Sequence, residues 1–434
     1  MSFNTALSGL QAARADLDVT ANNIANANTT GFKRSTATFS DVFSDTQSGA
    51  ADSAGNGVQL AKITQQFDQG KIEDSNSDLH LAINGNGFFA LQDEKGTVYT
   101  RDGAFLLDQQ GFLTSASGLQ VQAFPVVEGS AADGPENAQF SNGVLAPIQL
   151  TNPIGAPEAT DNVTLALNFK ADLEPRAGAI DPADQATFDY TTTINVFDSL
   201  GNSHQISVYA KRTDNNVYTV AAYFEDSDTP INSTPLQLQF GDDGKLEKSI
   251  GPAPDNKEIN FDANGSPDDE LTLLEIPAED VGKGAKPLSI KFEYGTSSML
   301  GSAFSIKEQN QDGRSTGRLT GLEIDSDGVV SAGYTNGLRE PLGKIALATF
   351  GNNQGLRAVG GNTFVNTPES GEPVLGEAGT STFGLIQAGG LETSNVDISQ
   401  QLVRLITAQR NFQAASKVIS TNDQITQTAI NLGR

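Results

Sequence analysis

The sequence predicts a multidomain α+β protein. Long helices at the two ends of the chain would form a paired, coiled-coil-like inner domain that carries two nested, mainly antiparallel β domains. Three observations predict this arrangement. Apolar residues recur every seven positions at both ends of the chain. Strand and turn patterns fill the middle. The length of 434 residues allows about two to four domains.

The N-terminal helix is predicted from a heptad pattern that ends near residue 25. Alanines within it favour a helix, and Arg14 is a charged defect in the pattern. Gly31 follows a polar stretch and can adopt the left-handed conformation found after helix ends. The apolar positions of this helix are Phe3, Leu7, Leu10, Leu17 and Ile24.

The C-terminal helix is predicted from the same spacing, and Asp397 is its expected N-cap. The two helices would be roughly 35 and 55 Å long at 1.5 Å per residue. Large apolar residues are sparse in both, so the helices either pack on their own domain or become ordered only on assembly. The apolar positions of the C-terminal helix are Ile398, Leu402, Leu405, Phe412, Ile419, Ile425 and Leu432.

The middle of the chain predicts short strands separated by turns. Residues 190–197 and 206–210 alternate in polarity, and with residues 217–224 they predict a three-stranded antiparallel meander. Residues 79–83 predict another strand. No βαβ alternation is present, so a parallel sheet is not expected.

Shifts in composition predict four nested parts, because pairing of the terminal helices requires the chain to leave and return. The small polar stretch 44–57 predicts a flexible link. The expected parts are an inner helical domain (1–30 with 395–434), a connecting segment (31–75 with 376–394), an outer β domain (76–146 with 308–375) and an inserted β domain (147–307).

Charge and composition exclude several function classes. The net charge is −26, and the two ends (1–34 and 396–434) carry +1 and +2, which leaves −29 for the body. Such an acidic surface repels phosphate, so nucleic acid is not an expected partner. The chain has no cysteine and two histidines, which excludes thiol chemistry and multi-histidine metal sites. No apolar run is long enough for membrane insertion, and no cleaved signal peptide is visible.

Ligand motifs are present only in weak form. Residues 85–90 match G-x-G-x-x-A, but a strand pattern follows where a dinucleotide site needs a helix. The sequences 325–328, 242–244 and 262–265 begin like calcium loops and then depart from the pattern. His80 and His204 have no convincing partner in the sequence. We therefore predict turns at the glycine and aspartate motifs, and we predict no catalytic residue, no cofactor and no metal.

Three separated motifs carry a family resemblance. The stretch 22–33, with Asn22, Asn23, Asn26, Gly31 and Phe32, resembles the N-terminal signature of bacterial flagellar rod and hook proteins. The stretches 394–397 and 408–414 resemble their C-terminal signature, and 99–105 resembles their shared β domain. The C-terminal motif residues are Asn395, Asp397, Gln409 and Arg410.

The large insertion at 147–307 favours the hook members of that family over the shorter rod members. The resemblance implies a structural subunit, not an enzyme, that polymerises into a curved hollow helical tube. Such a tube acts as a universal joint that transmits torque from the rod to the filament. The implied location is extracellular, in the hook of the flagellar basal body.

The implied partners are further copies of the chain, the distal rod protein, the hook cap, the hook–filament junction protein and the flagellar type III export apparatus. Export through that apparatus needs no cleaved signal. Phe3 and Leu7 have the Phe-x-x-x-apolar form of an export-gate element. Two alternatives remain open at this point: a distal rod protein of the same family, and an extracellular β-rich surface or adhesin protein.

Overall fold

The computed structural model divides the chain into two compact units. The terminal unit comprises Met1–Thr151, Thr320–Gly333 and Arg339–Arg434, and the inserted unit comprises Asn152–Leu319 and Tyr334–Leu338. The predicted link 44–57 lies outside the described residues except for Gly57. The described residues are 3–42, 57–93, 95–127, 134–141, 143–225, 227–231, 235–251, 257–262, 265–268, 273–282, 284–380 and 382–432.

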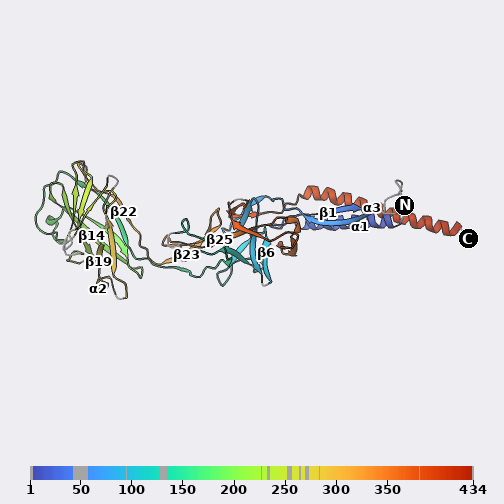
Figure 1. Ribbon diagram of the computed structural model, residues 1–434, viewed down its shortest axis with the longest axis horizontal. Helices are drawn as coiled ribbons and strands as arrows, with labels where there is room; N and C mark the ends of the chain where they lie inside the picture. The colour runs from blue at the N-terminus through green and yellow to red at the C-terminus, as the bar shows by residue number, and fades with distance from the viewer. Residues whose placement is uncertain are drawn as a thin grey trace. The chain divides into compact units, whose positions relative to one another are not determined.

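Two long helices from opposite ends of the chain pack against each other in the terminal unit. They are α1 (Phe3–Ala25) and α3 (Ile398–Leu432). The helices lie side by side and antiparallel, so the start of α1 and the end of α3 point the same way (Figure 1). Asp397 caps α3, because its carboxylate accepts a hydrogen bond from the Gln400 amide at 3.1 Å. The predicted pairing of the two terminal helices is confirmed.

A two-stranded hairpin runs beside α1. Its strands β1 (Ser35–Asp41) and β2 (Val58–Gln65) pair antiparallel, with a bulge where Thr38 and Phe39 meet β2. The Val58 amide donates to the Ser8 hydroxyl of α1 at 3.3 Å. The hairpin is therefore tied to the helix pair.

The main sheet of the terminal unit interleaves strands from both halves of the chain. Within it, β24, β25, β9, β5, β6, β27 and β26 are neighbours in that order. The buried core includes Phe89, Leu91, Ile345 and Leu347, all wholly buried. The sheet strands are β5 (Phe88–Asp93), β6 (Gly96–Thr100), β7 (Phe105–Leu107), β8 (Leu113–Ser115), β9 (Gln120–Phe124), β10 (Ala146–Pro147), β23 (Gly317–Ile324), β24 (Val329–Tyr334), β25 (Arg339–Thr349), β26 (Arg357–Gly360), β27 (Thr363–Val365) and β28 (Val374–Glu377).

Two short two-stranded ladders pair a segment from the first hundred residues with a segment just before α3. The strand β4 (Leu81–Asn84) pairs with β29 (Leu385–Ala388), and β3 (Ile72–Asp74) pairs with β30 (Gly390–Glu392). Gly85 and Gly87 follow β4 with φ of +116° and +132°, and β5 comes next. The G-x-G-x-x-A stretch therefore forms a turn between strands, as the sequence predicts.

The inserted unit contains a six-stranded and a five-stranded sheet around one core. The core centres on side chains such as Val163, Phe169, Tyr218 and Leu238. The six-stranded sheet contains β13 (Tyr190–Phe197), β14 (Ser203–Asp214), β15 (Val217–Phe224), β16 (Leu236–Phe240), β17 (Leu246–Ile250) and β18 (Glu258–Asn260). The five-stranded sheet contains β12 (Asn162–Lys170), β19 (Leu273–Ile276), β20 (Leu288–Glu293), β21 (Ser298–Leu300) and β22 (Ser305–Gln311). The unit also contains β11 (Ile154–Gly155), which pairs with β23, the 3-10 helix η2 (Gln185–Thr187) and the short helix α2 (Ala278–Val281).

The predicted meander is confirmed, because β13, β14 and β15 pair antiparallel in sequence order. The Asp198 carboxylate accepts bonds from the Leu200 and Asn202 amides in the turn after β13. One expectation is wrong: β12 pairs parallel with β20 and with β21. The connection from β12 to β20 contains the whole six-stranded sheet instead of a single crossover helix, so the lack of βαβ units does not exclude parallel pairs.

Candidate functional site

The packed surfaces of α1 and α3 centre on small and polar residues. On α1 the buried residues are Ala13, Thr20 and Asn23, which are small or polar. On α3 a stripe at alternating spacings of four and three faces α1, and its members are Gln401, Leu405, Ala408, Phe412, Ala415, Ile419 and Asn422. The most buried members of that stripe, Gln401 and Ala408, are small or polar like those of α1.

The expected assembly residues fall into two groups. Leu10, Leu17, Ile24, Leu405, Phe412 and Ile419 are partly covered. Phe3, Leu7, Ile398, Leu402 and Ile425 are exposed. The side chain of Leu432 is outside the described residues, and the role of all these residues in assembly stays a prediction.

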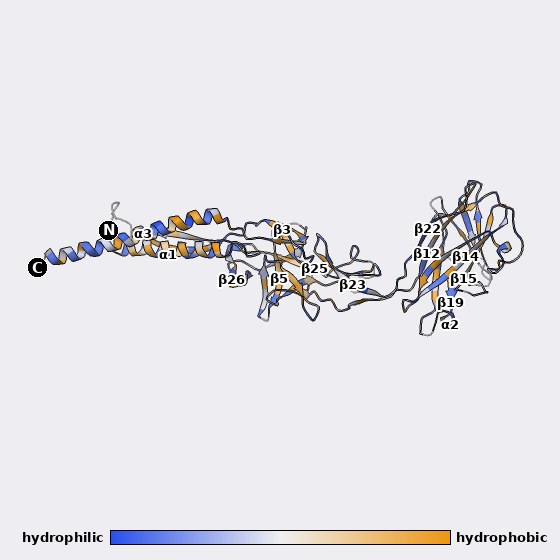
Figure 2. Ribbon diagram, turned by 180° about the vertical axis from the view of Figure 1, so that it is seen from behind, coloured by the Kyte–Doolittle hydropathy of each residue, from blue (hydrophilic) through white to orange (hydrophobic). Residues whose placement is uncertain are grey.

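Further apolar side chains on the outside of α3 were missed by the heptad analysis. Val403, Ile406, Val418 and Ile430 are exposed. Figure 2 shows hydrophobic and hydrophilic residues alternating along both helices. A second periodic stripe through Leu402 and Ile406, four residues apart, is the signal that could have identified this face.

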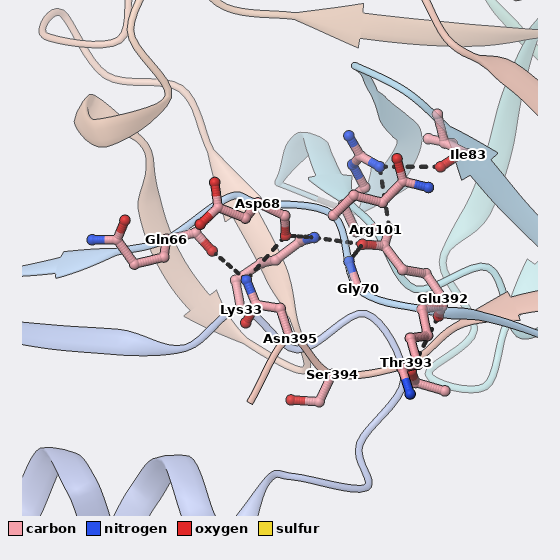
Figure 3. Close-up of polar contacts among 12 residues, drawn as sticks. Lys33, Gln66, Asp68, Gly70, Ile83, Arg101, Glu392, Thr393, Ser394 and Asn395 are labelled. Atoms are coloured by element: carbon pink, nitrogen blue, oxygen red, sulfur yellow. Dashed lines mark hydrogen bonds and ion pairs between the residues drawn. The ribbon is translucent and has the colours of Figure 1, made fainter. Parts of the chain in front are cut away.

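The three family motifs meet at one place in the terminal unit, shown in Figure 3. Its centre is Glu392, the last residue of β30, whose carboxylate is wholly buried. The Lys33 ammonium donates to Glu392 Oε1 at 2.6 Å, and Arg101 Nη1 donates to Oε2 at 3.1 Å. The Gly70 amide donates to Oε1 at 2.7 Å. We call Lys33, Arg101 and Glu392 the buried ionic cluster.

Backbone carbonyls accept further hydrogen bonds from the two cations. Lys33 Nζ donates to the Asp68 carbonyl at 2.9 Å. Arg101 donates to the Ile83 and Gly85 carbonyls at 3.3 and 2.7 Å, and its guanidinium lies 5.5 Å from the centre of the Phe88 ring. Two positive groups thus share one carboxylate and three backbone carbonyls, whereas the buried Arg101 Nε has no hydrogen-bond partner among the described residues.

Burial and the carboxylate act in opposite directions on the two cations. Desolvation lowers the pKa of Lys33, and the neighbouring Glu392 carboxylate opposes that shift. The same two causes act on Arg101, and burial again gives the lower pKa. The cluster is therefore costly to bury unless every partner is present.

Asn395 extends this junction toward α3. Its Oδ1 accepts from the Arg34 amide at 2.8 Å, and its Nδ2 donates to the Gln66 and Asp68 carbonyls at 2.8 and 3.0 Å. Asp397 then caps the helix. One asparagine therefore joins the segments on either side of the β1–β2 hairpin to the start of α3.

The N-terminal motif residues close the end of α1. Asn23 exchanges two hydrogen bonds with the Ser35 backbone at 2.8 Å and donates to Gln401 Oε1 at 3.3 Å. Asn26 Nδ2 donates to the Asn22 carbonyl. Gly31 has a φ of +67°, as its position in the sequence predicts, and its amide donates to the Glu392 carbonyl at 2.8 Å.

The other motif residues lie outside the buried ionic cluster. Phe32 is partly buried, and its carbonyl accepts from the Asn395 amide at 3.4 Å. Gln409 and Arg410 are exposed on α3. Sequence reasoning included Lys33 and Arg101 within motifs but missed Glu392. A lone acidic residue after the apolar Leu391 was the available signal.

The two histidines have partners that the sequence did not reveal. His80 Nδ1 lies 2.5 Å from the Ser75 hydroxyl. His204 lies between two carboxylates, 2.8 Å from Glu225 Oε1 and 3.3 Å from Asp198 Oδ2. Asp198 already holds the turn after β13. This histidine, in β14, therefore contacts the residue that follows β13 and the residue that follows β15.

Comparison with known proteins identifies the family. The chain is 36% identical to the flagellar hook protein FlgE of Salmonella typhimurium over 438 residues, which covers 100% of both chains. The chain belongs to the flagellar hook protein family. The hook protein FlgE of Escherichia coli is also 36% identical, and that of Borreliella burgdorferi is 33% identical over 99% of both chains.

Family models match four segments in the order expected of a hook protein. They are the flagella basal body rod protein (3–33), the flagellar hook protein FlgE/F/G D1 domain (82–166), the flagellar basal body protein FlaE D2 domain (166–314) and the flagellar basal body rod FlgEFG protein C-terminal (387–432). The crystal structure of Helicobacter pylori FlgE2 shares the fold, with a TM-score of 0.50 at 17% identity, over 74% of this chain and 100% of that one.

Hook proteins are structural proteins, not enzymes, that polymerise in the flagellum and serve motility. The family places this chain in the flagellar hook. None of the helices in the described part of the chain has the length and hydropathy needed to cross a bilayer. The buried ionic cluster and the exposed faces of α1 and α3 are therefore read as parts of a polymer subunit.

Proposed function

We propose that copies of this chain form a curved hollow helical tube, in which the paired helices α1 and α3 of neighbouring copies pack together around a channel. The tube acts as a universal joint and transmits torque from the rod to the filament. The observation that carries the proposal is the row of exposed apolar side chains on the helix pair.

That row is densest at the start of α3. Leu402, Val403 and Ile406 are 46, 65 and 50% exposed in the single chain. Leu402 and Ile406 are four residues apart on one helix face, and Val403 lies on the adjoining face. Contiguous exposed apolar residues mark surfaces that bind other proteins, because burying them removes apolar area from water.

The distribution of charge supports the same location for subunit contacts. The two ends of the chain carry +1 and +2, whereas the body carries −29. Like-charge repulsion between copies is therefore weakest at the helices. Contacts between the acidic bodies would be polar and wet, which suits surfaces that slide as a bent tube rotates.

The remaining partners are proposed from the family resemblance. They are the distal rod protein, the hook cap, the hook–filament junction protein and the flagellar type III export apparatus, which would export the chain without a cleaved signal. Phe3 and Leu7 are 47 and 37% exposed. Their accessibility supports a role as the export-gate element.

Electron microscopy of the purified, concentrated chain tests the assembly proposal. Wild-type protein precipitated with ammonium sulfate is expected to form curved hollow tubes. The variant L402D/I406D is expected to stay unassembled, because each aspartate would have to be buried in an apolar contact. Straight tubes from the wild type would instead favour the distal rod alternative.

A matched control places the same two charges elsewhere on α3. Thr407 and Asn411 are exposed and four residues apart, on a different face from Leu402 and Ile406. The variant T407D/N411D is expected to form tubes. Loss of tubes in both variants, with helix content unchanged by circular dichroism, would assign the effect to charge and contradict the role of the apolar row.

A further inference from the structure

The buried ionic cluster joins four segments that are far apart in the sequence. Glu392 receives bonds from Lys33, Gly70 and Arg101, and its own carbonyl accepts from Gly31. Two of these segments lead directly into the helices: residues 31–33 follow α1, and residues 393–397 precede α3. The cluster thus lies where both helices leave the β structure.

The chemistry of the cluster is better suited to fixing the positions of the joined segments than to adding net folding stability. Two cations surround one anion, and all three side chains are at least nine-tenths buried. The desolvation of buried ion pairs offsets much of their attraction, so apolar replacements of similar volume are often as stable. The hydrogen bonds of each charged group, however, form only in particular directions.

We infer that Glu392 is a positioning residue, whose buried carboxylate fixes the direction in which α1 and α3 leave the β structure of the terminal unit. Lys33 and Arg101 hold that carboxylate from opposite oxygens, so it cannot rotate. Asn395 and Asp397 then carry the fixed direction into α3. Without the carboxylate, the terminal unit stays folded but the helices adopt a spread of directions.

The lack of cysteine in the chain allows a direct test on the unassembled protein. Spin labels are placed through Q109C and T407C, two exposed positions in the terminal unit, on the β structure and on α3. Pulsed electron–electron resonance then measures the distribution of distances between them. The full-length wild type is expected to give one narrow distribution.

The decisive variant, K33M/R101M/E392L, removes all three charges and approximately retains the volume. Its thermal midpoint is expected within about 5 °C of the wild-type value, while its distance distribution becomes at least twice as wide. The matched control K344M/E377L removes another ion pair of the same unit, 2.7 Å apart. That control is expected to keep the narrow distribution.

If the triple variant does not fold, E392D decides the question, because its carboxylate keeps the charge but is too short to reach both cations. It is expected to widen the distribution as well. A folded triple variant or E392D with the wild-type width overturns the inference. The readout does not require polymerisation, so its failure is distinct from failure of the proposed tube.

Discussion

Lys33 and Glu392 form an ion pair of 2.6 Å across a sequence separation of 359 residues, and both side chains are buried. The pair links the segment after α1 to the segment before α3. Arg101 completes it from the main sheet. A single carboxylate therefore connects both ends of the chain to the β structure between them.

The first prediction concerns removal of that carboxylate alone. Replacing Glu392 by Gln leaves Lys33 and Arg101 buried without a counter-charge, which should cost about 3–5 kcal/mol of unfolding free energy. Urea unfolding followed by circular dichroism measures it. The control E323Q breaks the exposed pair of Glu323 with Arg339 and should cost less than about 1 kcal/mol. Equal losses of unfolding free energy in E392Q and E323Q would contradict the burial of the cluster.

The second prediction uses Gly31, which has a φ of +67° and approaches Asp102 closely. A Cβ at this position would lie 2.5 Å from the Asp102 amide nitrogen. G31A should therefore be more destabilising than G118A, since Gly118 has a φ of +82° but no atom within 4 Å of its added Cβ. The control should lose only about 1 kcal/mol. Thermal unfolding of both variants gives the comparison.

The third prediction concerns Asp16 on α1. Burial raises the pKa of Asp16, and the positive Arg404 only partly opposes this. The folded helix pair therefore favours the protonated carboxyl, and the pair gains stability as the pH falls through the raised pKa toward 3.8. Below that value the gain is complete, because both states are protonated.

The variant D16N isolates this effect from other carboxylates. It should be more stable than the wild type at pH 7, and the difference should vanish on acidification below about pH 3.8. Hydrogen exchange of α1 amides, compared at each pH, measures the difference. A wild type as protected as D16N at pH 7 would contradict the prediction.

The fourth prediction concerns alkaline pH and the inserted unit. Burial raises the pKa of Tyr218 and Tyr294 above 10.0. The folded unit keeps both phenols protonated, whereas the unfolded chain ionises them near pH 10, so stability falls as the pH rises above about 10. Tyrosinate absorbance at 295 nm should rise together with loss of β structure. In Y218F/Y294F the loss should shift to higher pH.

Local patterns were sufficient to predict much of the fold. The heptads predict α1 and α3, and the stretches predicted as strands at 190–197 and 217–224 give the bounds of β13 and β15. These features depend on neighbours a few residues apart. The cap at Asp397 and the left-handed Gly31 are local in the same sense.

Features that depend on distant segments could not be predicted. The heptad phase on α1 follows the large residues, yet the structure buries Ala13, Thr20 and Asn23. Asn23 is buried by contacts with Ser35 and Gln401, which lie far from it in the sequence. Glu392 resembles any surface acid in the sequence, because its partners lie hundreds of residues away.

The short ladders β4–β29 and β3–β30 have a consequence for the order of folding. Both require the final fifty residues of the chain, as does Glu392. A chain that emerges from a ribosome or a narrow channel does so from its N-terminus. The strands β3 and β4 then have no partners until β29 and β30 have also emerged. The inserted unit, whose contacts close within 152–338, can mature first. The terminal unit therefore cannot complete its fold until the final fifty residues have emerged.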